Sequence, residues 1–101
     1  MCDFMIKAVF HRQGGEVLLA ACESELFGRC LESDDLVLDL GSEFYNGEEV
    51  NGEEFCGMLV QATQANIVGH EAVRLAIQQN MVHPDSVIEI CGIPHAMFIC
   101  M

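Results

Sequence analysis

The sequence predicts a single α+β domain in which a two-helix hairpin packs on one face of a mainly antiparallel sheet. Two observations predict this class. Segments that alternate between apolar and polar residues lie near both ends of the chain, and two amphipathic helical patterns lie between them. No linker, repeat or biased tract interrupts the 101 residues, of which 51% are hydrophobic, so residues 1–101 are expected to form one domain around one core.

The N-terminal part of the chain predicts a β-hairpin. Residues 3–11 place alternate side chains on two faces, as a strand does. The sequence Gln13-Gly14-Gly15 tolerates a positive φ and predicts a turn, and residues 16–22 form the returning strand. The elements expected next are a helical turn at 24–27, an extended piece at 29–32, a strand at 36–40 and a polar loop at 45–47.

Two helices are expected in the second half of the chain. Asn51 and Glu54 have the spacing of a capping box, and the apolar residues after them recur at helical spacing, which predicts a helix over 52–65. A second helix is expected to end at Asn80, because Pro84 prevents its continuation. The remaining segments are a tight connection between the helices at 66–69 and two last strands at 86–91 and 96–100, linked by 92–95.

The net charge is the most unusual feature of the composition. The chain has 16 Asp and Glu residues against 4 Lys and Arg residues, a formal net charge of −12. Direct DNA binding is not expected, because proteins that neutralise phosphates carry a Lys/Arg footprint. Two explanations remain open: the acidic surface is an adaptation to concentrated intracellular salt, or it complements a basic protein or a ribonucleoprotein.

The six cysteines are expected to be buried free thiols in a cytoplasmic protein. Asp3 and Lys7 interrupt the first apolar stretch, so no export sequence is expected and a disulfide scaffold is disfavoured. No apolar run reaches the roughly 18 residues that a transmembrane helix needs, so no membrane partner is expected. The cysteine spacings contain no CxxC, and neither a metal nor a cofactor is expected.

The sequence contains no established catalytic motif. The patterns GxSxG, HExxH and GxxxxGK[ST] do not occur, and the acidic pairs at 34–35, 48–49 and 53–54 are typical of a solvated surface. No catalytic residue is assigned, and binding is favoured over catalysis. Residues 65–70 partly resemble the turn of a helix-hairpin-helix, which binds phosphate through helix N-terminal amides, although close packing at Gly69 explains the segment equally well.

The few cations indicate one candidate anion site. Lys7 and His11 share a strand face, Arg12 follows, and the glycine turn lies beside them, an arrangement that suits an anion. In the alternative interpretation, Lys7 and Arg12 only neutralise nearby carboxylates. His95 lies in the last turn. Together with His11 and a cysteine it would suit zinc, but hydrogen bonds from both histidines to turn backbone are expected instead. The candidate ligand-binding residues are Lys7, His11, Arg12, Gly14, Gly15 and His95.

Three strings carry a resemblance to a known family. Residues 11–20 read HRQGGEVLLA, residues 65–69 read ANIVG with Ala72 and Val73 just after, and residues 92–96 read GIPHA. In this order and at this spacing they resemble the small archaeal family called domain of unknown function 424. The resemblance spans nearly the whole chain and implies a stand-alone cytosolic archaeal domain. It implies no activity and no catalytic or ligand residue.

Two hypotheses of function follow. The favoured one is a non-catalytic binding or adaptor module of information processing whose acidic surface docks a basic protein or a ribonucleoprotein. The alternative is an anion-binding or small-molecule-binding protein, or an enzyme, with a site near Lys7, His11, Arg12 and His95. A homodimer is a further expectation, because residues 96–100 are apolar on both faces and would be hazardous as an exposed edge; the other interpretation places them in the sheet centre.

Overall fold

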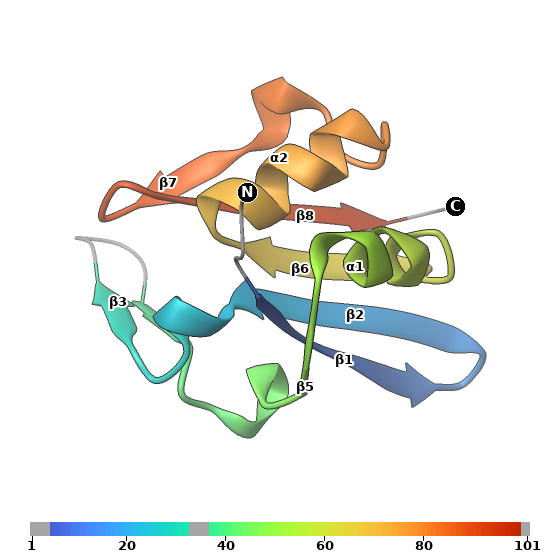
Figure 1. Cartoon of the computed structure of the whole chain (residues 1–101), viewed down its shortest axis with the longest axis horizontal. Coiled ribbons are helices and arrows are strands. Elements are labelled where there is room, and N and C mark those ends of the chain that lie inside the picture. Colours follow the sequence, from blue (N-terminus) through green and yellow to red (C-terminus); the bar gives the residue numbers. More distant parts are fainter. Residues whose placement is uncertain (1–4, 33–36, 100–101) are drawn as a thin grey trace.

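The computed structural model describes residues 5–32 and 37–99 (Figure 1). In these ranges the chain forms a six-stranded sheet in the order β5-β1-β2-β6-β8-β7, a two-stranded sheet of β3 and β4, and two helices. The predicted mixed α+β class with a mostly antiparallel sheet is confirmed. The elements are β1 (Ile6–Gln13), β2 (Glu16–Glu23), β3 (Cys30–Glu32), β4 (Val37–Asp39), β5 (Glu48–Val50), α1 (Gly52–Leu59), β6 (Gln64–Val68), α2 (His70–Gln78), β7 (Ile88–Ile90) and β8 (Ile93–Ile99), with short 3-10 turns η1 (Ser24–Leu26), η2 (Glu43–Tyr45) and η3 (Pro84–Ser86).

The hairpin of β1 and β2 agrees with the prediction. The strands pair antiparallel from Ile6 opposite Glu23 to Gln13 opposite Glu16. Gly14 and Gly15 make the turn at φ angles of 58° and 87°, a conformation that glycine adopts without steric cost. The first residues of the predicted strand, 3 and 4, lie outside the described ranges.

The segment between the two helices is a strand, so the predicted helical hairpin is wrong. α1 ends at Leu59 instead of Ala65, and β6 takes the place of the expected tight connection. β6 pairs parallel with β2 and antiparallel with β8, in the middle of the sheet. The physical reason is a period of two, since Ala65 and Ile67 are buried on one face while Gln64 and Asn66 lie on the other.

Some other boundaries also differ from the prediction. β4 covers Val37–Asp39 of the strand expected at 36–40, and Leu40 already belongs to the turn that follows. β8 begins at Ile93, so most of the expected link at 92–95 is strand, and Cys91 and Gly92 make the turn at φ angles of 54° and 78°. The edge strand β5 was not predicted, because two of its three residues are exposed glutamates and give no strand pattern. Their charges protect this edge of the sheet from pairing with other chains.

Alternate residues of the central strands enter two apolar clusters, one on each face of the sheet. On the first face, Leu19, Ala21 and Ile67 share a cluster with residues of both helices, including Phe55 of α1 and Val73 of α2. On the second face, a different cluster gathers around β3, β4 and β7. Its buried members are Ala20, Cys22, Leu26, Leu31, Leu40, Tyr45, Val68 and Ile90.

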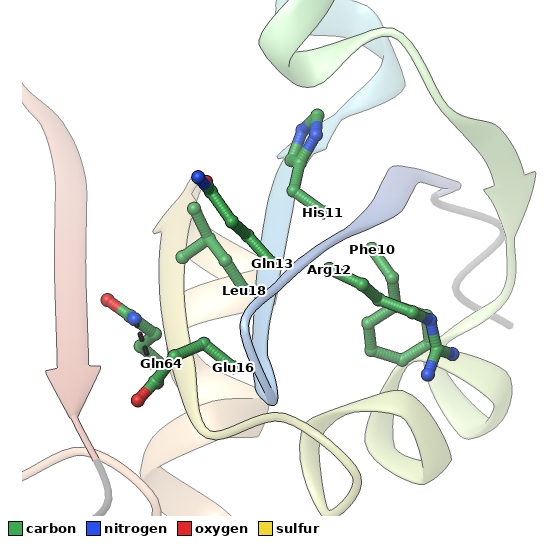
Figure 2. A pocket seen from close by; sticks show the side chains of 7 residues that line it. All are labelled: Phe10, His11, Arg12, Gln13, Glu16, Leu18 and Gln64. Carbon is green, nitrogen blue, oxygen red and sulfur yellow. Dashed lines mark hydrogen bonds between the residues drawn. The ribbon is translucent and has the colours of Figure 1, made fainter.

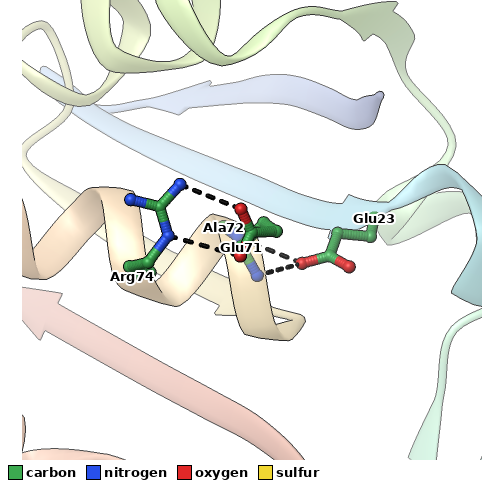
Figure 3. Close-up of polar contacts among 4 residues, drawn as sticks. All are labelled: Glu23, Glu71, Ala72 and Arg74. Carbon is green, nitrogen blue, oxygen red and sulfur yellow. Dashed lines mark hydrogen bonds and ion pairs between the residues drawn. The ribbon is translucent and has the colours of Figure 1, made fainter. Parts of the chain in front are cut away.

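A buried carboxylate joins the end of β2 to the start of α2 (Figure 3). Glu23 is buried, and its Oε2 accepts hydrogen bonds from the backbone N–H groups of Glu71 (2.6 Å) and Ala72 (3.0 Å). These donors belong to the first turn of α2, where unpaired N–H groups and the helix dipole favour a negative charge. Gly69 precedes the helix at a φ of 122°, and a Cβ at this position would collide with the Glu23 side chain.

We expect Gly69→Ala to destabilise the chain strongly, because it forces an unfavourable φ and displaces the Glu23 carboxylate from the helix. The expected loss of unfolding free energy is about 2–4 kcal/mol, and Glu23→Ala should cost about 1–3 kcal/mol by leaving two amides unpaired. Urea unfolding measures both. The control is Gly57→Ala, at an open helical position, which should stabilise by about 0.5–1 kcal/mol. Equal effects of the two glycine substitutions would contradict this account.

Candidate functional site

The structure does not bring the six predicted ligand residues together. Lys7 lies opposite Cys22 on β2, which lies opposite Val68 on β6, which in turn lies opposite His95 on β8. Two whole strands therefore separate Lys7 from His95. Neighbouring strands are about 4.8 Å apart, so the two residues are separated by roughly 14 Å of sheet.

Lys7 and His11 hold the loop around η2 against the sheet. The Lys7 Nζ lies 4.7 Å from the ring centre of Phe27 and donates a long hydrogen bond of 3.5 Å to the carbonyl of Gly47. The His11 Nε2 donates to the carbonyl of Phe44 at 2.9 Å, and its ring stacks on the Phe44 ring with 4.9 Å between centres. The predicted role of His11, bonding turn backbone, is confirmed.

Arg12 lies at the end of the hairpin, beside a surface hollow of about 610 Å³ (Figure 2). Its guanidinium carbon lies 5.2 Å from the ring centre of Phe10. Figure 2 shows this pair extending to one side of the hairpin while Gln13 and Leu18 extend to the other. Arg12 and Leu18 therefore lie on opposite sides of the hairpin. Anion binding by Arg12 and the exposed Gly14–Gly15 turn stays a prediction.

His95 is buried, with 9% of its surface exposed, and neither ring nitrogen has a hydrogen-bond partner among the described residues. The expected hydrogen bond from His95 to turn backbone is therefore wrong. Burial lowers the pKa of this imidazole below its usual value of 6.5, which favours the neutral ring. In residues 5–32 and 37–99 no group of three or more His, Cys, Asp or Glu side chains is placed to hold a metal ion.

The helix start at Gly69 already holds an anionic group, the carboxylate of Glu23. The partial resemblance of residues 65–70 to a phosphate-binding turn concerns the same amides that Glu23 accepts from. An external phosphate would have to displace this buried carboxylate. Close packing at Gly69, the alternative interpretation of the segment, agrees with the structure.

The described cysteines are free thiols in different surroundings. Cys22 is buried, and burial raises the pKa of its thiol to about 11, with Lys7 lowering it and Glu23 raising it by smaller amounts. This thiol stays protonated at neutral pH and is a poor nucleophile. Cys30 and Cys91 are exposed, contrary to the expectation of buried thiols, while Cys56 is half-buried. No helix within the described ranges is long and apolar enough to span a membrane.

An uncovered area on the second face of the sheet is the best candidate for a binding surface. Met97 and Ile99 of β8 point to this face and have 57% and 69% of their surface exposed. Beside them lie Asn66, opposite Met97, and Gln64, opposite Ile99. A hollow of about 340 Å³ follows this part of the sheet. We call this area the β8 surface and define it by Leu18, Gln64, Asn66, Met97 and Ile99.

The outer edge of β8 is open over half of its length. β7 pairs only with residues Ile93, Pro94 and His95, whereas β6 pairs with β8 as far as Ile99. Among the described strands, none pairs with the outer edge of β8 from Ala96 to Ile99. The sequence left open whether this strand is an exposed edge or lies in the sheet centre. It is paired on both sides at its start and on one side only at its end.

Sequence reasoning missed the β8 surface because it depends on β6. The residues Gln64, Asn66 and Val68 alternate with Ala65 and Ile67, and this period of two was the available signal. The helical patterns on either side instead predict a helix end and a loop at these residues. Without β6 in the sheet, the neighbours of Met97 and Ile99 could not be identified.

Comparison with known proteins decides the family. Residues 11–101 match the family model described as "Protein of unknown function (DUF424)". The chain belongs to this family. The resemblance noted in the sequence is thereby confirmed, and no curated protein matches the chain.

A similar fold is found in a solved structure described as the "Crystal structure of an uncharacterized conserved protein from Methanopyrus kandleri". Its TM-score to this chain is 0.77 at 19% sequence identity, and the match covers 96% of this chain and 94% of that one. The similarity shows that the two proteins share a fold. Any function of this DUF424 member must be argued from its own surface.

The buried imidazole predicts a pH-dependent stability. Because the folded pKa of His95 is below its unfolded value of 6.5, the unfolded chain takes up this proton first as pH falls. The stability that neutral His95 contributes is complete above pH 6.5 and is lost as pH falls through the folded pKa. We expect wild type to lose up to about 1 kcal/mol more than His95→Leu between pH 7.5 and pH 5.5 in urea unfolding.

The control for this prediction is His83→Leu, because the side chain of His83 is 71% exposed. This variant should keep the pH dependence of wild type. An identical pH dependence in wild type and His95→Leu would contradict the assignment of the effect to the buried ring.

Proposed function

We propose that the chain is a non-catalytic binding module that docks a basic protein on its β8 surface. The observation that carries the proposal is the pair of large apolar side chains, Met97 and Ile99, exposed on an uncovered sheet face. Contiguous exposed apolar groups on a small domain typically mark a place where another molecule binds. Burial of these two side chains would contribute about 2–4 kcal/mol before the costs of association.

The net negative charge of the chain indicates that the partner is basic. Residues 75–101 contain Asp85 and Glu89 but no Lys or Arg. On the other side of the β8 surface, Gln64 donates to the exposed carboxylate of Glu16 at 3.1 Å. Glu16 therefore brings negative charge to one side of the β8 surface, and the whole chain has a net charge of −12, so a basic partner is favoured and an acidic one is repelled.

A basic partner is consistent with an adaptor role in information processing. Proteins that bind nucleic acids are basic as a class, because they neutralise phosphates. An acidic module that binds such a protein contacts the protein and does not need its own phosphate-binding residues. The bound protein would bring any RNA into the complex.

The test is partner capture with matched surface variants. The tagged chain is incubated with nuclease-treated lysate of the source organism at the salt concentration of its cytoplasm. We expect wild type and Val60→Lys to retain the same basic protein, and Met97→Lys and Ile99→Lys, made as two separate variants, each to lose at least nine-tenths of it. Val60 is the control because it is equally exposed, at 67%, and lies at the end of α1.

Each named substitution adds one positive charge at an exposed site, so a general charge effect would appear in the control as well. Equal retention by all variants would contradict the β8 surface as the docking site. Arg12→Ala should leave retention of the partner unchanged. If this variant instead lost the partner, the hairpin end would be the docking site.

A further inference from the structure

We infer that the outer edge of β8, from Ala96 to Ile99, accepts an extended segment of the basic partner as an additional antiparallel or parallel strand. This inference rests on the proposed function and specifies how the partner is held. Three observations support it: the outward hydrogen-bonding groups of the edge, its lack of protecting charges, and the net negative charge of the chain.

Within residues 5–32 and 37–99, no strand pairs with the outer backbone groups of β8 beyond His95. The N–H of Gly69 donates to the carbonyl of Pro94 at 3.0 Å, so the backbone groups of Pro94 point toward β6. Because these groups alternate along a strand, those of Ala96 and Phe98 also point toward β6. The N–H and C=O groups of Met97 and Ile99 therefore point outward, beyond the reach of the short strand β7.

The two edges of the main sheet differ in how they are protected. β5, at one edge, consists of three residues of which two are exposed glutamates. Charges on short edge strands prevent unwanted pairing with other chains. The free part of β8 reads Ala-Met-Phe-Ile and contains neither a charge nor a proline. An unprotected edge of this kind is a template for strand addition.

The side chains beside this edge define the sequence of the added strand. Met97 and Ile99 lie on one face, so residues of the partner strand on that face would be apolar, since cross-strand apolar pairs stabilise a sheet. The intervening positions lie on the other face, where the exposed Glu89 of β7 lies opposite Pro94. This carboxylate and the net charge of −12 favour Lys or Arg at those positions. A second copy of this chain fits less well, because it brings the same charge of −12 and an uncharged edge strand.

The experiment uses the full chain and a synthetic peptide of alternating Lys and Val. Three probes are compared by calorimetric titration: this peptide, the same peptide with N-methyl groups on alternate amides, and an analogue with Glu in place of Lys. We expect the Lys/Val peptide to bind at least about tenfold more tightly than either analogue, because N-methylation removes strand hydrogen bonds and Glu reverses the charge.

Amide hydrogen exchange then locates the binding site on the protein. In the free chain the amides of Met97 and Ile99 should exchange quickly, whereas those of Ala96 and Phe98 are protected by β6. The Lys/Val peptide should slow exchange at Met97 and Ile99 by at least about tenfold. Val60→Lys should leave both measurements unchanged, and Met97→Lys should weaken binding.

The outcomes separate the inference from the proposed function. Equal binding of the N-methylated and unmodified peptides would overturn strand addition while leaving the β8 surface as a docking site. A dimer with Met97 and Ile99 amides already protected would also overturn it, because a second copy would then cover the edge. Failure of every peptide, together with successful partner capture that depends on Met97 and Ile99, would overturn strand addition alone.

Discussion

The contact of the Glu23 carboxylate with the first turn of α2 fixes the relation between the hairpin, the central strand and the second helix. It joins the end of β2 to the helix that follows β6, and these strands are parallel neighbours. Gly69 makes the contact sterically feasible, because any Cβ there would collide with the carboxylate. The parallel pair of β2 and β6 then determines where β8 lies and which part of it stays uncovered.

The same contact argues against phosphate binding at the start of α2. The amides that a phosphate would use are paired within the molecule. Lys7 and His11 are similarly engaged with the loop around η2. What remains outward is an apolar pair on β8, next to an open strand edge, on a chain with a net charge of −12. These properties suit a basic extended segment better than a small anion.

Local patterns in the sequence predicted much of the fold. The hairpin turn at Gly14–Gly15, the capping box of Asn51 with Glu54 and the second helix are set by neighbouring residues, and all are present. β6 was missed because its short alternation lies between two helical patterns. The candidate site could not be assembled, because whether Lys7 lies near His95 depends on strand order. Glu23 gave no signal of its own, since burial of a carboxylate depends on a distant helix.

The most direct test of the account is photo-crosslinking from two positions of the chain in native lysate. A benzophenone side chain is introduced in separate samples at position 97, on the β8 surface, and at position 12, at the hairpin end. The account predicts that position 97 forms a crosslink to a basic protein, and that position 12 does not. A crosslink from position 12 alone would contradict docking on β8 and would place the partner at the hairpin end.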